Sequence, residues 1–216
     1  MANYRADRAL VAAVEAIHPG GDPWEAFSAL QQSEQRALEA TGAKSPRARD
    51  RVTDLERRWL RAALGQGNLV AAAALFPDPS RADAPIFAPA RFAKLREESV
   101  DRVLTAAHAA LRRQAQPTYT DRWMLHAAAN IHAAGTDRPR NPAQARQLYA
   151  AAFAAGDTLA ALGAARMAKE AGLAAEAYRW ALRCTGPCRT PGFDLSTYQA
   201  GLTKDAIAKA QEDTRS

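Results

Sequence analysis

The chain has 216 residues, which is enough to bury a real core in one domain or in two small ones. Hydrophobic residues make up 48% of it, but no run of 18 apolar residues occurs, so the sequence predicts no membrane span. The formal net charge is +6, yet the 29 basic and 23 acidic residues are interleaved, and no motif that reads DNA or RNA accompanies them. The composition therefore does not favour a nucleic-acid-binding protein.

Alanine dominates the sequence with 54 residues, whereas aromatic residues contribute only 7%. Alanine is the best helix former and has almost nothing to pack with, which suits helices that approach closely around a few large side chains. Valine and isoleucine are sparse and never alternate over a useful length, so strand signals are nearly absent. The sequence predicts an all-α fold.

Capping signals mark where most of the helices begin. Asp22, Ser45 and Asn141 each precede a proline that suits the first helical position, and Thr120 and Thr203 precede two further helical runs. We expect helices at residues 4–17, 24–40, 47–65, 69–76, 90–115, 120–134, 142–155, 158–171, 173–184 and 203–212. The one long break, residues 76–90, contains four prolines and is a plausible joint between sub-domains.

One predicted helix is rich in arginine over residues 47–61. The stretch SPRARDRVTDLERRWLR, which contains it, carries six Arg and three acidic residues. An apolar stripe that includes Trp59 runs along this helix, and Asp54 can pair with Arg58 one turn later. We interpret the arginines as the solvated face of an ordinary helix, with nucleic-acid binding as the alternative.

A packing unit is visible in the stretch NPAQARQLYAAAFAAGD, residues 141–157. Ala145 and Ala152 lie about two turns apart, so they share a face and let a neighbouring helix approach closely. Leu148 and Tyr149 supply the large side chains that fill the groove between helices. Gly156 is expected to end the helix in the left-handed conformation, after which an aspartate caps the next helix.

Parts of this unit recur along the chain. Upstream, an offset of 89 relates the unit to Trp59-Leu60, Ala63, Gly67-Asn68 and Ala71. Downstream, an offset of 30 relates it to Ala175, Tyr178 and Gly186. In the preceding helices, an offset of 37 relates Leu125 and Gly135 to Leu162 and Gly172.

The pattern resembles the Sel1-like repeat, a relative of the tetratricopeptide repeat. A unit of that family ends its first helix with glycine and spaces Ala, an aromatic pair, Ala and Gly-Asp along its second helix, as residues 135–157 do here. The resemblance covers residues 120–186 and implies a right-handed α-solenoid of antiparallel helical hairpins, preceded by a less regular helical N-terminal half. It also implies that Ala145, Leu148, Tyr149, Ala152, Gly156, Trp59, Gly67 and Tyr178 are packing positions of the repeat.

We divide the chain into four segments on these grounds. Residues 1–76 form a helical N-terminal region with one degenerate repeat, and residues 77–118 a proline-rich loop with a long connecting helix. Residues 119–188 hold the Sel1-like repeats, and residues 189–216 form a C-terminal capping segment.

Few residues suggest chemistry. Cys184 and Cys188 flank a Gly-Pro turn, where a local disulfide and free thiols both fit; two thiols are too few for a tetrahedral zinc site. His126, Asn130 and His132 lack a metal-binding spacing, because His132 falls on the far side of the helix from His126. We therefore predict no metal site, no cofactor and no catalytic residue.

The resemblance implies a bacterial protein–protein interaction module, an adaptor or regulator that binds a partner protein or peptide on the concave face of the array. Because aromatic and arginine side chains dominate interface hot spots, Arg122, Trp123 and Arg166 are the candidate contacts. An alternative is a hydrolase of cell-wall-type substrates, with Cys184 as the candidate thiol. We expect a monomer that is cytoplasmic if Met1 is the native start, and periplasmic or exported if a signal segment was removed.

Overall fold

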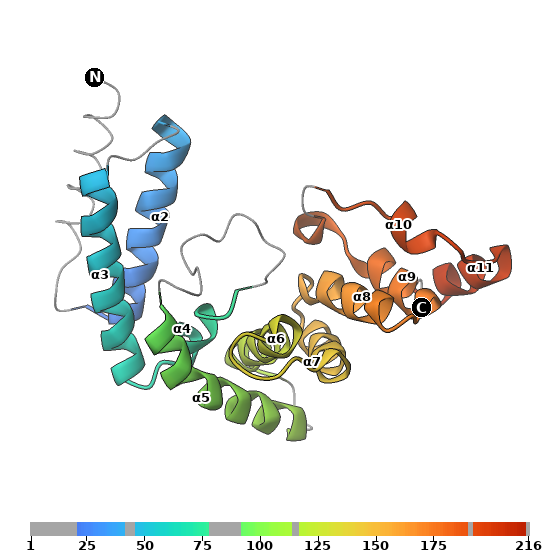
Figure 1. Ribbon diagram of the computed structural model, residues 1–216, viewed down its shortest axis with the longest axis horizontal. Helices are drawn as coiled ribbons and strands as arrows, with labels where there is room; N and C mark the ends of the chain where they lie inside the picture. Colours follow the sequence, from blue (N-terminus) through green and yellow to red (C-terminus); the bar gives the residue numbers. More distant parts are fainter. Residues whose placement is uncertain (1–20, 42–45, 78–91, 114–116, 190–191, 215–216) are drawn as a thin grey trace. The chain divides into compact units, whose positions relative to one another are not determined.

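The computed structural model spans the whole chain and describes residues 21–41, 46–77, 92–113, 117–189 and 192–214 (Figure 1). All regular secondary structure in these ranges is helical, which confirms the all-α class. The helix predicted at residues 4–17 lies outside the described residues. None of the described helices is long and apolar enough to cross a membrane.

The chain forms two compact units, residues 1–71 and residues 72–216. In the first unit α2 (Pro23–Thr41) packs against α3 (Pro46–Gly65), with Phe27, Leu30 and Leu60 fully buried. The next helix, α4 (Leu69–Ala74), contains the boundary between the units. The four-segment division of the chain stays a prediction.

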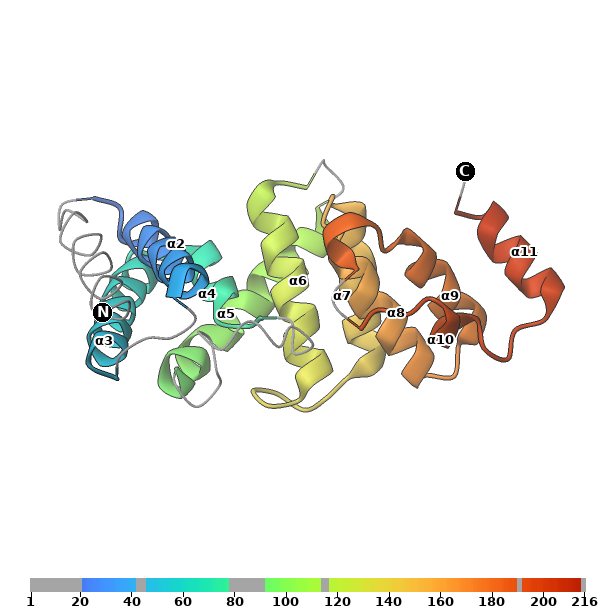
Figure 2. The same ribbon diagram turned by 90° about the horizontal axis from the view of Figure 1, so that it is seen from above.

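The second unit is a chain of helices that pack on their neighbours in order, as Figures 1 and 2 show. Its elements are α5 (Ala93–Arg112), α6 (Tyr119–Ala134), α7 (Pro142–Ala154), α8 (Ala160–Glu170), α9 (Ala174–Arg183), the 3-10 turn η2 (Gly186–Cys188), α10 (Ser196–Gln199) and α11 (Lys204–Glu212). Helices α10 and α11 both contact α9. The bounds of α6, α7, α9 and α11 lie within one residue of those predicted, whereas η2 and α10 were not predicted.

Three helices end in the same kind of turn, built on a glycine with positive φ. The glycines are Gly67 after α3 (φ 79°), Gly156 after α7 (φ 92°) and Gly172 after α8 (φ 73°). In each, the amide after the glycine donates to a carbonyl five residues earlier, at 2.9–3.0 Å, which satisfies a carbonyl at the helix end. The side chains of Asn68 and Asp157, which follow two of these glycines, then accept an amide hydrogen bond from the next helical segment.

The start of α6 differs from the prediction, because Thr118 and not Thr120 is the N-cap. The Thr118 hydroxyl accepts a hydrogen bond from the Asp121 amide at 3.1 Å, and the Asp121 carboxylate accepts one from the Thr118 amide at 3.0 Å. This reciprocal pair is a capping box, and it places the helix start at Tyr119. The caps predicted at Asn141 and Thr203 are confirmed.

Tyr149 is the central packing residue of α6, α7 and α8. Its ring is buried, and its hydroxyl donates a 2.7 Å hydrogen bond to Oδ1 of Asn130 on α6. On the other side, a Cβ added to Gly163 of α8 would lie 2.5 Å from the ring, so only glycine leaves room for it. Leu148, the other large side chain predicted to fill the groove beside α7, is fully buried, and so are the flanking Ala145 and Ala152.

Helix α9 repeats the burial pattern of α7 in a register different from the predicted one. At an offset of 29 from Leu148, Tyr149 and Ala152 lie Ala177, Tyr178 and Ala181, and all three are buried. Ala174, at the same offset from Ala145, is exposed. Tyr178 therefore takes the place of Tyr149 at an offset of 29, and not that of Leu148 at an offset of 30. The predicted register followed Gly186, but Gly186 belongs to η2 and does not end the helix directly.

A buried arginine holds the chain that follows α4. Arg96 of α5 is only 5% exposed and forms an ion pair with Asp137, and it also donates to the Leu75 carbonyl. The neighbouring carbonyl of Phe76 accepts a 2.7 Å hydrogen bond from the Asn130 amide group. The two carbonyls that follow α4, those of Leu75 and Phe76, are therefore both satisfied by side chains.

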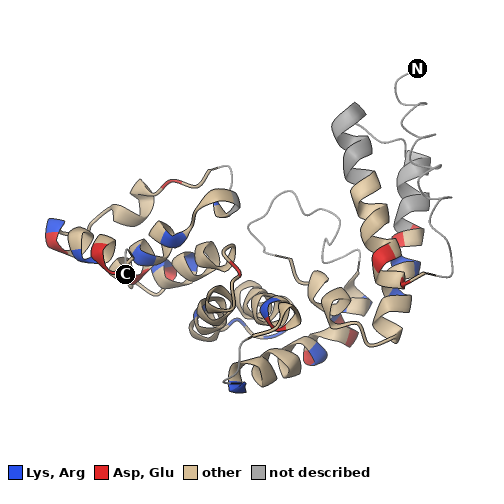
Figure 3. Ribbon diagram, turned by 180° about the vertical axis from the view of Figure 1, so that it is seen from behind, with Lys and Arg blue, Asp and Glu red and all other residues tan. Residues whose placement is uncertain are grey.

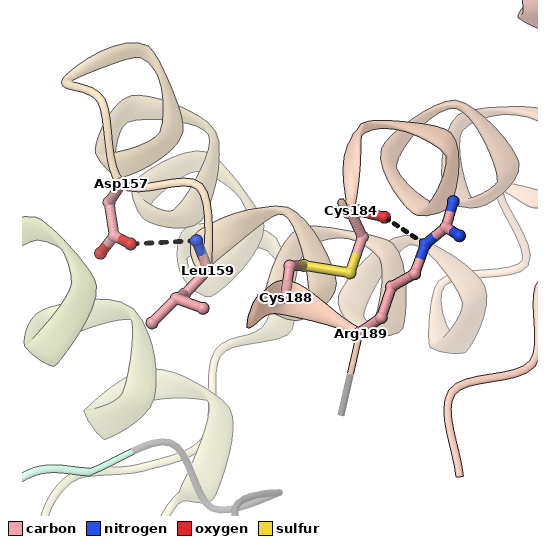
Figure 4. Close-up of a disulfide and its surroundings, with 5 residues drawn as sticks. All are labelled: Asp157, Leu159, Cys184, Cys188 and Arg189. Atoms are coloured by element: carbon pink, nitrogen blue, oxygen red, sulfur yellow. Dashed lines mark hydrogen bonds between the residues drawn. A yellow bond between two sulfur atoms is a disulfide. The ribbon is translucent and has the colours of Figure 1, made fainter. Parts of the chain in front are cut away.

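Cys184 and Cys188 form a disulfide across the turn after α9, both with buried side chains (Figure 4). The Arg189 guanidinium donates from Nε to the Cys184 carbonyl at 3.0 Å, which secures the chain as it leaves the turn. Beyond it, Phe193 and Tyr198 turn back and pack against this part of the core. Of the two states that fit the sequence, the structure has the disulfide.

Candidate functional site

Two exposed aromatic side chains lie close together on α6 of the second unit. Tyr119 and Trp123 are 59% and 39% exposed, and their ring centroids lie 6.1 Å apart. The Arg122 guanidinium carbon lies 4.8 Å from the centroid of the Tyr119 ring, in a cation–π arrangement. We refer to Tyr119, Arg122 and Trp123 as the α6 surface.

The capping box at the start of α6 fixes the backbone beneath this surface. Asp121, which completes the capping box, is buried and also forms an ion pair with Arg113, the residue that follows α5. Burial by itself would raise the pKa of Asp121, but the hydrogen bonds from Thr118 and the charge of Arg113 outweigh it, so the pKa is lowered. The first turn of α6 is therefore held in place while its aromatic side chains face solvent.

A histidine–aspartate pair continues the surface one turn further along α6. His126 Nδ1 lies 2.5 Å from Oδ2 of Asp157, and the other carboxylate oxygen accepts a 3.1 Å hydrogen bond from the Leu159 amide. Burial would raise the pKa of Asp157, but His126, the Leu159 amide and the nearby Arg122 together lower it. The Asp157 carboxylate thus ties α6 to the turn between α7 and α8.

The His126–Asp157 pair has one feature of a catalytic site, a carboxylate beside a histidine. A carboxylate can orient a histidine as a general base, but covalent catalysis also needs an activated nucleophile beside it. The candidate thiol, Cys184, is oxidised in its disulfide with Cys188 and cannot act as a nucleophile. Within the described ranges, no group of three or more His, Cys, Asp or Glu side chains could hold a metal ion.

The structure separates the three predicted contact residues into two clusters. Arg122 and Trp123 share the α6 surface, and Arg122 Nη1 also lies 3.5 Å from the Gly156 carbonyl. Arg166 of α8 instead hydrogen-bonds to Tyr198, in the segment that follows the disulfide. Sequence reasoning missed Tyr198 as a partner because it lies in a stretch with no helical periodicity.

The histidines of α6 play different roles. His126 packs edge-on against Tyr149 with ring centroids 5.6 Å apart, besides its contact with Asp157. Both ring nitrogens of His132 are buried without a hydrogen-bond partner among the described residues, and burial followed by the nearby His108 lowers its pKa. Asn130 of the same helix donates a hydrogen bond to the Phe76 carbonyl and accepts one from the Tyr149 hydroxyl.

The remaining predicted packing residues take up a range of environments. Tyr178 is buried, Gly67 has positive φ, and Trp59 is half-buried on α3. On the same helix, the ion pair formed by Asp54 is with Arg57, at 3.8 Å, where the sequence predicted Arg58. The side chains of residues 46–53, at the start of α3, are not among those that the structure describes.

Comparisons with models of known protein families, with curated proteins and with solved structures found no match for this chain. The resemblance to the Sel1-like repeat therefore depends on the residues of this chain alone.

Proposed function

We propose that this protein is a non-catalytic protein–protein interaction module that binds its partner through the α6 surface. The observation that carries the proposal is the exposed cluster of Tyr119, Arg122 and Trp123. Tyr, Trp and Arg are the residue types most enriched among interface hot spots, because they bury a large area and also offer polar groups.

The order already present in this surface supports a binding role. Arg122 rests on the Tyr119 ring, and the capping box and the His126–Asp157 contact hold the helix that carries both. Binding side chains that are ordered before the partner arrives lose less conformational entropy on association. A helix or an extended peptide of the partner would then gain affinity from a few buried anchors.

The proposal includes the repeat architecture implied by the sequence. In this account α6 with α7 and α8 with α9 are successive hairpins of a right-handed solenoid of the Sel1-like type, and α6 and α8 line its concave face. The shared glycine turns after α3, α7 and α8 support it, as do the equivalent tyrosines Tyr149 and Tyr178. Such an array would serve a bacterial adaptor or regulator.

The test compares three baits in an extract of the source organism: the wild-type chain, a Tyr119→Ala/Trp123→Ala variant and a Leu173→Ala control. Leu173 is as exposed as Trp123, at 39%, but lies outside the α6 surface. After nuclease treatment and a high-salt wash, we expect the wild type and the control to retain the same protein and the double variant to lose it. Equal retention by all three baits would contradict the proposal.

The same experiment also tests binding of nucleic acid by residues 47–61. A basic surface that neutralises phosphates releases counterions, so its affinity falls steeply with salt. Nucleic acid retained without nuclease and lost at high salt, with no protein retained, would favour that alternative over the α6 surface.

A further inference from the structure

A second surface of the protein surrounds the disulfide. Its centre is a buried cluster with partly buried side chains packed against it: Ala161, Leu162, Cys184 and Cys188, with Phe153, Leu159, Trp180, Phe193 and Tyr198. Four cationic side chains border this cluster, namely Arg166, Lys169, Arg183 and Arg189. Figure 3 shows the positions of Lys and Arg on the helices concerned.

Two of these cations belong to one stack of side chains. Lys169 Nζ lies 5.2 Å from the centroid of the Tyr198 ring, and the Tyr198 and Phe193 rings are stacked with centroids 6.1 Å apart. The Arg189 guanidinium carbon lies 5.9 Å from the Phe193 centroid. Lys169, Tyr198, Phe193 and Arg189 thus link α8 to the chain that follows the disulfide.

The other two cations are held by the same cluster. The Arg183 guanidinium carbon lies 4.9 Å from the Trp180 ring centroid, and that ring meets Phe153 edge-on at 5.4 Å. Arg166 hydrogen-bonds to Tyr198. All four positive groups are thereby restricted in position before any ligand arrives, which reduces the entropy lost on binding.

The carboxylates near this surface are directed elsewhere. Glu170 pairs with Arg140, Glu176 with Arg146, and Asp194 accepts hydrogen bonds from Ser196. Within the part of the chain that the structure describes, Lys169, Arg183 and Arg189 have no ion pair with any carboxylate. Lys169, Arg183 and Arg189 therefore give the surface more positive charge than the one nearby carboxylate without an ion pair, that of Asp194, could balance.

We propose that the surface formed by Arg166, Lys169, Arg183 and Arg189 binds an acidic protein segment. This inference rests on the proposed function, and it specifies that a partner segment carries several carboxylates. Ordered arginines bind carboxylates through paired, charge-assisted hydrogen bonds, and complementary charge favours both encounter and register. Single-stranded nucleic acid would need open aromatic faces for its bases, but each ring here already lies against a cation or another ring.

The test uses a fluorescein-labelled oligoglutamate peptide, titrated with the full chain at about 0.1 M salt and followed by fluorescence anisotropy. The variant is Lys169→Glu/Arg189→Glu, and the matched control is Lys204→Glu/Lys209→Glu on α11, whose two lysines are also exposed. Both pairs change the net charge equally. We expect the first variant to weaken binding by about tenfold or more and the control by less than about twofold.

Equal losses in the two variants would overturn the proposal, because the attraction would then be a property of the overall charge. A labelled oligothymidylate that binds more tightly than the oligoglutamate, and loses binding in the first variant, would assign the surface to nucleic acid instead. If circular dichroism shows that charge reversal unfolds the chain, the Lys169→Gln/Arg189→Gln variant replaces it, and unchanged binding in that folded variant would overturn the proposal.

Failure of this inference can be distinguished from failure of the proposed function. The oligoglutamate assay measures binding to the surface around the disulfide. Retention of the partner by the Tyr119→Ala/Trp123→Ala variant measures binding to the α6 surface. If the oligoglutamate does not bind but partner retention still requires Trp123, only the inference of an acidic ligand is overturned.

Discussion

The hydroxyl of Tyr149 donates a 2.7 Å hydrogen bond to Oδ1 of Asn130, and this contact joins α7 to α6 in the interior of the second unit. Asn130 in turn donates to the Phe76 carbonyl at 2.7 Å, so one buried amide connects α7, α6 and the chain that follows α4. Because both side chains are buried, loss of the Tyr149 hydroxyl leaves Oδ1 of Asn130 without this hydrogen bond in the protein interior.

We predict that Tyr149→Ala destabilises the protein by about 3–5 kcal/mol, as a large-to-small change in a packed core. Tyr149→Phe keeps the ring and removes the hydroxyl, which leaves the Asn130 oxygen unpaired and should cost roughly 1–3 kcal/mol. Chemical denaturation of the variants measures both values. A midpoint for Tyr149→Ala equal to that of the wild type would contradict the role of this tyrosine as the central packing residue.

Gly163→Ala should destabilise the protein although alanine is the better helix former. The added methyl group would lie 2.5 Å from the Tyr149 ring, which is buried and has no room to move. Overpacking of this kind costs typically about 1–3 kcal/mol. Gly65→Ala in α3 is the matched control, because nothing lies within 4 Å of its added Cβ, and it should be neutral or slightly stabilising. A neutral Gly163→Ala variant would show that α7 and α8 can separate without cost.

The stability of the protein should fall in mild acid through His132. Burial and the nearby His108 lower its pKa in the folded state below the ordinary value of 6.5, so the folded chain binds this proton less readily than the unfolded chain does. The contribution of neutral His132 to the free energy of unfolding is fully present at pH values above its ordinary pKa. It is lost as the pH falls from there through the lowered pKa of the folded state.

Replacement by His132→Phe removes the titrating group, so this variant should lose less unfolding free energy than the wild type between about pH 7.5 and about pH 5. Denaturation curves at the two pH values measure the difference. An equal loss in both proteins would assign the acid sensitivity to other groups.

Removing the disulfide should cost only a moderate amount of stability, because the loop it closes is short. The two cysteines are four residues apart, for which loop-closure entropy gives roughly 2 kcal/mol. Denaturation of the Cys184→Ala/Cys188→Ala variant, compared with the oxidised wild type, tests this value. A much larger loss would mean that the disulfide also holds the packed segment around Phe193 and Tyr198.

Local signals in the sequence were sufficient for most helix bounds. Asn141 and Thr203 as caps, and Gly135 and Gly156 as helix ends, act through backbone hydrogen bonds within a few residues, so their effect can be read from the sequence. The register of α9 was predicted wrongly because Gly186 suggested a helix end that the chain reaches only through η2. The α10 turn, Ser196–Gln199, is too short to show a periodicity.

Contacts between distant residues could not be predicted in the same way. Arg96 and Asp137 are 41 residues apart, and His126 and Asp157 are 31 apart, and no spacing rule relates such positions. Asp157 was predicted to cap the helix after Gly156, but the N-cap of α8 is Leu159, and Asp157 accepts a hydrogen bond from the Leu159 amide. Its contact with His126 depends on how α6 packs against the turn. For the candidate site, the sequence indicated Arg122 and Trp123 by residue type, whereas only the fold separates them from Arg166.

Titration calorimetry can test the α6 surface by measuring the affinity of the retained partner, once purified, for the wild-type chain, Trp123→Ala and Leu173→Ala. Because the two side chains are equally exposed, loss of apolar surface alone would affect both variants in the same direction. We predict that Trp123→Ala weakens binding by roughly thirtyfold, as expected for a hot-spot residue, and that Leu173→Ala leaves it nearly unchanged. Equal affinities for all three chains would contradict the assignment of the α6 surface as the binding site.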